Sequence, residues 1–508
     1  MQQGSAPARS WLMVPIAAAL IVVGAKCWMI GRYGNPTPFW DQWSAEGGLL
    51  YPRFFDGTLR LSDLVAAHNE HRILLTRLWA LLLLELEGYW DPILQAAANA
   101  LLFGGFVAMF IAAFRPVFVR SDWLAFAAFA TVMFALPLGW ENTLEGFNSQ
   151  WYFLLLASIS GLLAIVGAAA FGLRWWIGFL LLVASYFCTA GGALSVSVAV
   201  AVSLAQFAAG QRRGTRDILA LVLLALVAAA MLHDIPVLPR HAGLKAHSVA
   251  EFVRAAIKAA SWPAAPGPVP FILQLPCAIL INAPAAVASF RVIRQKLPLT
   301  DRLWLLPALA GWAVLQIAAI AYGRASGTYA ARYFDLYLIG TLVNGASLIY
   351  LLREFRDSWL RERRGSAAVA LWLLLVVPGS ATLVVWQSIH SLPPFAEAGR
   401  AETENMRAFL ATGDRRMLEN KPRLDVPFPN IDVLIAIASM PVVRAILPPA
   451  LVGEENAARA QTRGLARYTG RTVETIKTYA VRWGVLLIPL GLALFLVGIM
   501  RRREAKAA

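Results

Sequence analysis

The sequence predicts an all-α polytopic membrane protein with about twelve membrane-spanning helices. Of its 508 residues, 59% are hydrophobic and only 15% are charged, and the mean hydropathy is +0.60. A soluble protein of this length needs far more polar surface. A helix crosses a bilayer with about 20 mostly apolar residues. We place such segments at 11–30, 92–114, 122–139, 151–172, 175–188, 192–209, 217–233, 268–290, 303–322, 330–351, 367–388 and 483–500.

The distribution of basic residues predicts the orientation of these spans. The net charge is +15, but the excess arginine and lysine lies in alternate short connectors, which is the pattern of loops retained on the cytoplasmic side. Because the membrane orientation accounts for the positive charge, we do not expect the protein to bind nucleic acid. With both termini inside, the cytoplasmic connectors hold Arg115, Arg120, Arg174, Arg212, Arg213, Arg216, Arg291, Arg294, Lys296, Arg302, Arg353, Arg356, Arg361, Arg363, Arg364, Arg501, Arg502, Arg503 and Lys506.

The predicted organisation has three parts. A transmembrane module covers 1–390, an extracytoplasmic segment covers 391–482, and the last helix with its basic tail covers 483–508. The module has outer loops at 31–91, 140–150, 234–267 and 323–329.

Several helices outside the spans are also predicted. Segment 73–88 is apolar but short and carries Arg77, Glu85 and Glu87, so we expect a juxtamembrane helix. Ser248 and Glu251 form a capping-box pattern before an amphipathic helix suited to the membrane surface. Residues 402–412 are expected to form a helix that ends at Gly413. Charges and a proline in 431–450 indicate helices packed at the surface rather than a span.

The first outer loop carries an acid between tryptophans, Trp40-Asp41-Gln42-Trp43. Ionisable groups at a membrane edge are costly, so they often have a function. An apolar surround raises the pKa of a carboxylate and suits it to proton transfer. We therefore take Asp41 as a candidate catalytic base, with Trp40 and Trp43 as platforms for a sugar ring. The alternative is an interfacial aromatic belt containing an incidental acid.

The same loop ends in a cluster of ionisable residues, His68-Asn69-Glu70-His71-Arg72. On a helix, His68, His71 and Arg72 would share one face at i, i+3 and i+4, with Glu70 on the next face. Two histidines and a carboxylate suggest a metal site, whereas the fork of Arg72 matches phosphate oxygens. The structural alternative is a helix cap bonded to the first loop.

Two further outer loops supply candidate binding residues. Acids and amides lie between Trp140 and Trp151, which suits a sugar or an ordinary polar turn: Glu141, Glu145, Asn148 and Gln150. Arg324 and Arg332 face outward against the charge bias, so we expect them to bind a lipid phosphate or to reach lipid headgroups. Tyr333 and Lys245 are assigned to the same phosphate site, with Arg240 ranked lower.

Little ionisable chemistry is expected elsewhere. All six histidines fall at or near the outer face, and the span interiors are almost free of charge. Asp335 is expected to pair with Arg332 at i+3. No nucleotide-binding or dinucleotide-binding motif is found.

The arrangement resembles the GT-C superfamily of membrane glycosyltransferases over about residues 11–290. The shared features are an inside N-terminus, an acidic first outer loop with a juxtamembrane helix, and an amphipathic helix between the seventh and eighth spans. Asp41 matches the first-loop acid of that superfamily. The frequent Asp-x-Asp is absent because residue 43 is Trp, so a divalent metal is possible but has no such motif to support it, and no cofactor is certain.

The resemblance implies transfer of a monosaccharide from a polyprenyl-phosphate donor to a glycan or lipid acceptor of the cell envelope. The reaction would take place on the extracytoplasmic face of a bacterial inner membrane, and Asp41 would take the proton of the acceptor hydroxyl. The expected partners are the lipid-linked sugar, the acceptor and membrane lipids.

Three other readings remain open. An O-antigen ligase or polymerase would rest on Arg324, Arg332 and His390 instead of Asp41. A lipid-linked sugar flippase or transporter predicts ionisable residues paired inside the spans. The last is a structural membrane subunit without activity.

Overall fold

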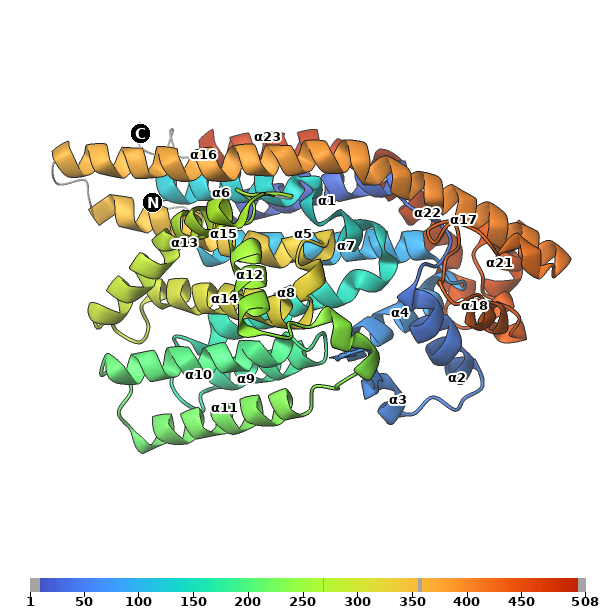
Figure 1. Ribbon diagram of the computed structural model, residues 1–508, viewed down its shortest axis with the longest axis horizontal. Helices are drawn as coiled ribbons and strands as arrows, with labels where there is room; N and C mark the ends of the chain where they lie inside the picture. Colours follow the sequence, from blue (N-terminus) through green and yellow to red (C-terminus); the bar gives the residue numbers. More distant parts are fainter. Residues whose placement is uncertain (1–9, 268, 355–358, 501–508) are drawn as a thin grey trace, which may run out of the picture.

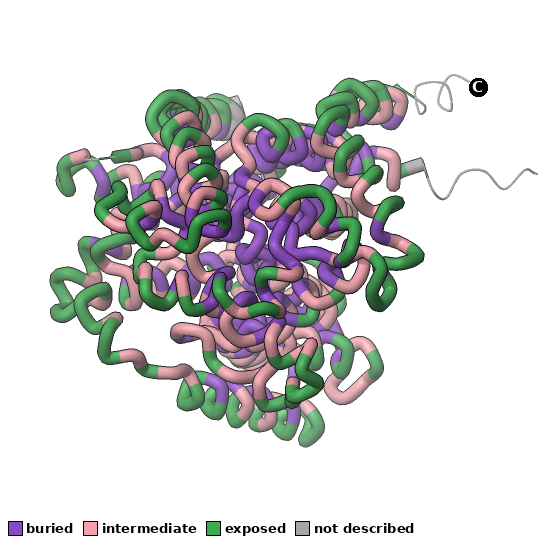
Figure 2. The backbone as a smooth tube through the Cα atoms, turned by 90° about the vertical axis from the view of Figure 1, so that its right-hand side faces the viewer, coloured by how far each residue is buried: buried purple, intermediate pink, exposed green. Residues whose placement is uncertain are grey.

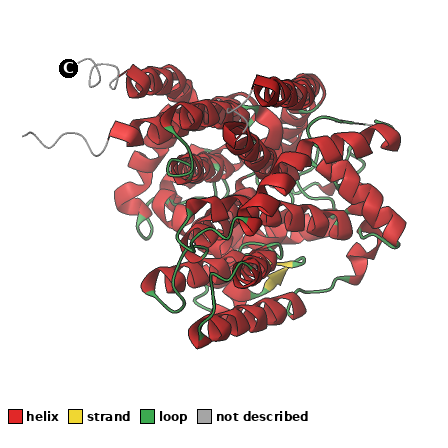
Figure 3. Cartoon of the chain, turned by 90° about the vertical axis from the view of Figure 1, so that its left-hand side faces the viewer, coloured by secondary structure: helices red, strands yellow, loops and turns green. Residues whose placement is uncertain are grey.

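The computed structural model describes residues 10–267, 269–354 and 359–500, and these residues are helical nearly throughout (Figures 1 and 3). Ten of the described helical segments are long and apolar enough to cross a membrane. Their main helices are α1 (Met13–Tyr33), α5 (Pro92–Ala113), α6 (Arg120–Ala135), α8 (Ser149–Ile165), α11 (Thr215–His233), α13 (Phe271–Arg294), α14 (Leu305–Gly323), α15 (Phe334–Glu354), α16 (Trp359–His390) and α23 (Leu487–Met500). Two shorter apolar helices are α9 (Leu173–Tyr186) and α10 (Gly192–Ala208).

The remaining elements lie mostly at one end of the bundle, on the right in Figure 1. The prediction of an all-α polytopic protein is confirmed, and ten of the twelve predicted spans coincide with helices long enough to cross a membrane. The predicted spans 175–188 and 192–209 coincide with the shorter helices α9 and α10. The other elements are a π-helix (Trp43–Leu50), α2 (Tyr51–Phe55), α3 (Leu61–Val65), β1 (Ala67–His68), β2 (His71–Arg72), α4 (Leu74–Glu87), α7 (Trp140–Leu144), α12 (Val249–Ala260), α17 (Leu392–Thr412), α18 (Ile431–Ala438), α19 (Pro441–Arg444), α20 (Pro449–Val452), α21 (Glu454–Ala460) and α22 (Ala466–Trp483).

The basic connectors meet at one end of the bundle. Arg120 donates from Nη2 to the carbonyl of Gly498 at 2.7 Å, and Gln211 donates from Nε2 to the carbonyl of Lys296 at 2.8 Å. Helix α14 begins beside Arg302 at this end and finishes before Arg324, about 28 Å away at 1.5 Å per residue. Arg324 therefore lies at the opposite end. Arg356 and the basic tail 501–508 fall outside the described residues.

Helices α1 and α23 run antiparallel, so the start of α1 and the end of α23 lie at the same end of the bundle. Small residues allow their close approach: a Cβ at Gly491 would lie 2.7 Å from the carbonyl oxygen of Ala17, and one at Gly498 would lie 3.1 Å from Val14. Membrane helices often pack closely at glycine, because inside a bilayer the hydrophobic effect does not favour helix association.

The end of the bundle opposite the basic connectors has a hydrophobic core of its own, built from two distant parts of the chain. Trp43, Tyr51 and Trp90 of the first outer loop pack with Phe409 and Leu434 of the C-terminal segment. Figure 2 views this end and shows buried chain at the centre with exposed chain around it. The segment 391–482 thus contributes apolar side chains that complete the core of the first predicted outer loop.

The predicted outer helices form, with adjusted boundaries. The juxtamembrane prediction corresponds to α4, whose 14 residues are too few for a span. Ser248 accepts a hydrogen bond from the Glu251 amide, but the Glu251 carboxylate bonds the amide of His247 instead of closing the box on Ser248. Helix α17 ends at Gly413, as predicted, where φ is 70°.

Labelling of single cysteines tests the orientation. We expect a membrane-impermeant maleimide to label Asp56→Cys in intact cells, and Arg213→Cys only after permeabilisation, because the two exposed positions lie at opposite ends. Cys277, the half-buried native thiol, is first replaced by serine. The reverse labelling pattern would refute the orientation.

Candidate active site

The segment that carries most candidate residues is a β-hairpin, not the predicted helix. His68 pairs directly with His71, and Ala67 pairs with Arg72. Asn69 has a φ of 52°, a left-handed conformation that Asn tolerates and that closes a tight turn. Because paired residues share a face of a hairpin, the two imidazoles lie together, whereas Arg72 belongs to the next pair along the strands.

The carboxylate of Asp41 lies close to the imidazole of His68 on this hairpin. Its Oδ2 lies 3.5 Å from Nε2 of His68, and its side chain is 45% exposed whereas that of His68 is 14% exposed. The His68 ring packs edge-on against Phe147, 5.3 Å between centroids, which holds the imidazole in place. The carboxylate is therefore accessible from outside, while its hydrogen-bonding partner is fixed.

The electrostatic surroundings reverse the predicted pKa shift of Asp41. Partial burial raises the pKa of this carboxyl, but the hydrogen bond and attraction of His68 and the charge of Arg332 outweigh it, so the pKa lies below its usual value. The expectation of a raised pKa is wrong because the His68 hydrogen bond and the nearby Arg332 guanidinium oppose the effect of burial. Asp41 is ionised at neutral pH.

Glu70 is the best-connected carboxylate of the hairpin. Its Oε2 accepts from Nη2 of Arg324 at 2.8 Å, and its Oε1 lies 2.6 Å from Nδ1 of His241. Burial raises the pKa of Glu70, but the hydrogen bonds and charges of Arg324 and His241 lower it to about 2. Glu70 is thus an anchor that ties the hairpin to the loop after α14 and the loop after α11.

Arg72 makes a second anchor rather than a free phosphate ligand. Its Nε and Nη2 form a two-pronged ion pair with Asp234, at 2.7 and 2.9 Å, and Tyr186 donates its hydroxyl to the same carboxylate at 2.6 Å. The neighbouring turn residue Asn69 accepts from Arg240 at 2.7 Å. Asp234 immediately follows α11, so this contact again joins the hairpin to the end of a spanning helix.

His71 is held neutral. Its Nδ1 accepts from the amide of Ala190 at 3.2 Å, and its ring lies 6.3 Å from that of Trp151. Burial lowers its pKa to about 4, against the attraction of Glu70. A neutral imidazole does not supply charge to a phosphate, so His71 can act only through hydrogen bonding.

The loop predicted at 140–150 is a short helix, α7, followed by a helical turn into α8. Glu141 pairs with Nη1 of Arg332 at 3.2 Å and also accepts from the amide of Ala331 at 3.2 Å. The Arg332 side chain remains 44% exposed and lies over the buried ring of Tyr333 at 5.5 Å. Arg332 is therefore the arginine of this group with the most capacity to accept an anion.

Glu145 contrasts with Asp41 in protonation. Burial and the neighbouring charge of Glu141 raise its pKa to about 8, and Nδ2 of Asn148 donates to its Oε2 at 2.9 Å. Arg332 and Asp41 are also within electrostatic range. A site that keeps one carboxyl ionised and its neighbour protonated has separate groups for accepting and donating protons.

A buried lysine and a buried aspartate lie beneath these residues, inside the bundle. Lys26 of α1 donates from Nζ to Oγ1 of Thr143 at 2.9 Å and interacts with Asp335 of α15. Asp335 accepts from Nδ2 of Asn142 at 2.8 Å, and the same amide donates to the Arg332 carbonyl at 2.9 Å. The expectation that Asp335 pairs with the Arg332 side chain is wrong, because its carboxylate accepts from Asn142 and Asn142 bonds the Arg332 carbonyl. Lys26 and Asp335 are the ionisable groups that this network buries inside the bundle.

The aromatic candidates divide between surface and core. Trp43 is fully buried, with its Nε1 bonded to the Pro38 carbonyl at 2.6 Å, so it cannot stack on a sugar in this structure. Trp40 is half-buried under the guanidinium of Arg423 at 4.7 Å. Because Trp43 is buried, Trp40 remains as the aromatic candidate for a sugar. The amide candidates Asn148 and Gln150 are buried as well.

Two outlying candidates have less contact with the cluster. Lys245 is half-buried in the loop whose Ala246 amide bonds the Tyr322 carbonyl at 2.8 Å, next to Arg324. His390 ends α16, and its ring lies tilted against that of Trp386 with 4.3 Å between the ring centroids. Within the described residues, no group of three or more His, Cys, Asp or Glu side chains is arranged to hold a metal ion.

The sequence analysis missed Glu46, which lies in the π-helix that follows Asp41. This buried carboxylate accepts from Nε1 of Trp90 at 2.7 Å, from Nε2 of Gln95 at 3.1 Å and from the Tyr51 hydroxyl at 3.2 Å. Burial raises its pKa to about 7. π-helical turns commonly occur at functional sites. The detectable signal was an acid inside an otherwise apolar, glycine-containing stretch.

No protein-family model matches the sequence, and no curated protein or solved structure matches it either. A function for the chain must therefore be argued from the contacts described above.

The Glu70 anchor predicts a specific response to acid. Its contribution to stability is complete above the unfolded carboxyl pKa of about 4.3 and is lost as pH falls toward 2, because protonation breaks both ion pairs. Glu70→Gln should lower the free energy of unfolding by about 3 kcal/mol near neutral pH. The same substitution should also weaken the fall in the free energy of unfolding between about pH 4 and pH 2.

The measurement is thermal unfolding of the purified chain in detergent over this pH range. Glu404→Gln, at an exposed position of α17, is the control and should leave the curve unchanged. An acid limb that is identical in Glu70→Gln and the parent chain would contradict the assignment.

The buried Lys26–Asp335 pair predicts strong coupling in a double-mutant cycle. Lys26→Met leaves Asp335 without its countercharge and should cost about 3–5 kcal/mol. Adding Asp335→Asn should recover part of that loss, as judged by thermal unfolding of both single variants and the double variant. Strictly additive effects would show that the two charges do not interact.

Proposed function

We propose that this chain is a membrane glycosyltransferase that moves a monosaccharide from a polyprenyl-phosphate donor to a glycan or lipid acceptor of the cell envelope. The observation that carries the proposal is the half-exposed, ionised Asp41 carboxylate, fixed by His68 and within electrostatic range of the exposed Arg332. A base beside a cation at the membrane surface suits a substrate with a hydroxyl nucleophile and a lipid phosphate leaving group.

The proposed topology has twelve spans with both termini in the cytoplasm of a bacterium and the Asp41 site on the periplasmic or exterior side. The clustering of basic connectors at the end opposite Arg324 supports this orientation. A donor anchored in the outer leaflet then presents its phosphate at the level of Arg332.

In the proposed reaction the acceptor hydroxyl attacks the anomeric carbon and a new glycosidic C–O bond forms. The bond from that carbon to the phosphate oxygen breaks, its electron pair leaves with the polyprenyl phosphate, and Asp41 takes the hydroxyl proton. Arg332 stabilises the anionic leaving group, so no acid is needed there. The outcome is inversion through one displacement, unlike the two-carboxylate hydrolytic scheme.

The lowered pKa of Asp41 keeps the carboxylate ionised at the expense of basicity, which suits a proton transferred late in the displacement. Glu145, whose pKa is about 8, retains its proton at neutral pH and can donate a hydrogen bond to a sugar oxygen. Trp40 is positioned as the sugar platform. Its ring is half-buried and remains partly accessible beside Asp41.

A lipid-linked sugar transporter is the second candidate, and the buried Lys26–Asp335 pair favours it. The pair is bonded to Thr143 and Asn142, the residues adjoining Glu141, so it lies directly under the outer site. At that position the two residues are better placed to support the Glu141–Arg332 pair than to form a transport gate at the middle of the membrane. An O-antigen ligase would need Arg324 free, whereas Glu70 occupies it.

Substitution of Asp41 tests the proposal. The purified chain in nanodiscs is given a panel of polyprenyl-phosphate monosaccharides with membrane-derived glycan and lipid acceptors, and the release of free polyprenyl phosphate is measured. Asp41→Asn should reduce turnover by roughly 10²- to 10⁴-fold because the proton acceptor is lost. Asp56→Asn, at an exposed position of the same loop, is the control and should retain full activity.

Full activity of folded Asp41→Asn would refute the assignment of the base. Movement of the intact lipid-linked sugar across the bilayer, without release of polyprenyl phosphate, would favour the transporter instead.

A further inference from the structure

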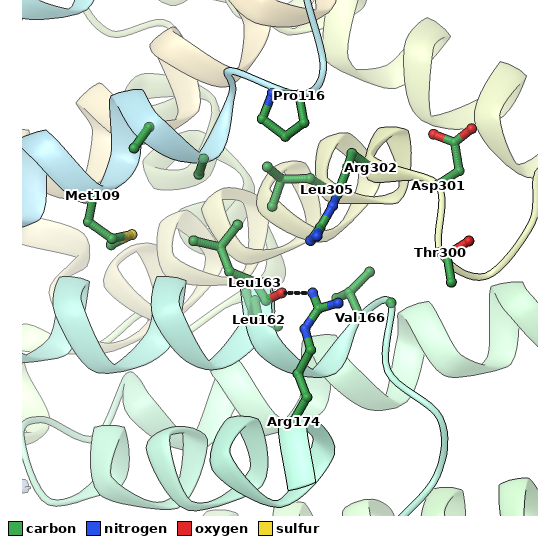
Figure 4. A pocket seen from close by; sticks show the side chains of 13 residues that line it. Met109, Pro116, Leu162, Leu163, Val166, Arg174, Thr300, Asp301, Arg302 and Leu305 are labelled. Carbon is green, nitrogen blue, oxygen red and sulfur yellow. Dashed lines mark hydrogen bonds between the residues drawn. The ribbon is translucent and has the colours of Figure 1, made fainter. Parts of the chain in front are cut away.

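A pocket of about 300 Å³ lies at the basic end of the bundle, far from the Asp41 site (Figure 4). It is enclosed by α5, α8 and α9 and by the connector that leads into α14. Most of its wall is apolar, formed by Met109, Ala112, Ala113, Pro116, Leu162, Leu163, Val166 and Leu305. On the adjoining surface, α9 exposes Trp176, Ile177 and Leu180, a face suited to lipid.

Two guanidinium groups enter this apolar pocket. Arg174 donates from Nη2 to the carbonyl of Leu163 at 2.6 Å, and Arg302 extends toward it from the opposite wall, as Figure 4 shows. No described residue forms a side-chain ion pair or hydrogen bond with Arg302. The one carboxylate nearby, Asp301, accepts from the Leu303 amide at 2.8 Å and points away from both arginines.

Like charges that face each other across an apolar space repel, and an anion between them removes that repulsion. A phosphate offers oxygens to both guanidinium forks at once. The apolar wall leaves room for a hydrocarbon chain beside the phosphate, and the surrounding basic connectors favour the leaflet that is rich in anionic lipid.

We propose that this pocket binds one anionic phospholipid, with its phosphate between Arg174 and Arg302 and the start of an acyl chain against Met109 and Leu162. The hydroxyl of Thr300, which also lines the pocket, supplies a further donor. The site is separate from the proposed transfer reaction and does not depend on it.

Lipid-dependent thermal stability tests this site. The purified full chain is titrated with phosphatidylglycerol, phosphatidylcholine of the same acyl chains, and inorganic phosphate. We expect phosphatidylglycerol alone to raise the unfolding temperature. The Arg174→Gln, Arg302→Gln double variant should need roughly tenfold or more phosphatidylglycerol for half of the effect, at several-fold per arginine. Arg216→Gln, exposed at the same end but outside the pocket, should match the parent chain.

Photo-crosslinking to the parent chain gives a second readout that does not depend on how the variants fold. Phosphatidylglycerol with a photoactivatable acyl chain should label residues 109–116 and 162–167. Labelling confined to other segments would overturn the proposal. An equal response to phosphatidylcholine, an equal response to inorganic phosphate, or an equal loss in Arg216→Gln would each overturn it as well.

Discussion

The ion pair between Glu70 and Arg324 joins parts of the chain that are 254 residues apart, and the outer site depends on it. With His241 it fixes the turn of the hairpin, while Arg72 and Asp234 fix the strand beyond it. These contacts hold His68 in place, and His68 in turn faces Asp41. Most acids and bases of the cluster thus pair with one another, and Asp41 and Arg332, although each has one partner, keep nearly half of their side-chain surface exposed.

The bilayer explains why so many ionisable groups meet at this end. Apolar spans exclude charge, so polar side chains collect where the helices finish. The exception, buried Lys26 near Asp335, is tolerated because Thr143 accepts a hydrogen bond from Lys26 and Asn142 donates one to Asp335. This pair extends the polar network from the surface into the bundle and supports the backbone of Arg332.

Local sequence patterns predicted the spanning helices, the start of α12 after Ser248 and the end of α17 at Gly413, because hydropathy and capping act over a few residues. They failed where distant segments decide the structure. His68–Arg72 became a hairpin because Asp234, His241 and Arg324 hold it, and none of these partners is near in sequence. The pKa of Asp41 was predicted in the wrong direction for the same reason. Trp43 looked like an interfacial residue, but the C-terminal segment buries it.

The most direct test of the account is an experimental structure of the chain in a lipid nanodisc with a polyprenyl phosphate bound. We expect the phosphate to lie against the guanidinium of Arg332, with the Asp41 carboxylate facing the position of the missing sugar. A phosphate bound at the other end of the bundle, or an Asp41 side chain sealed away from the bound lipid, would contradict it.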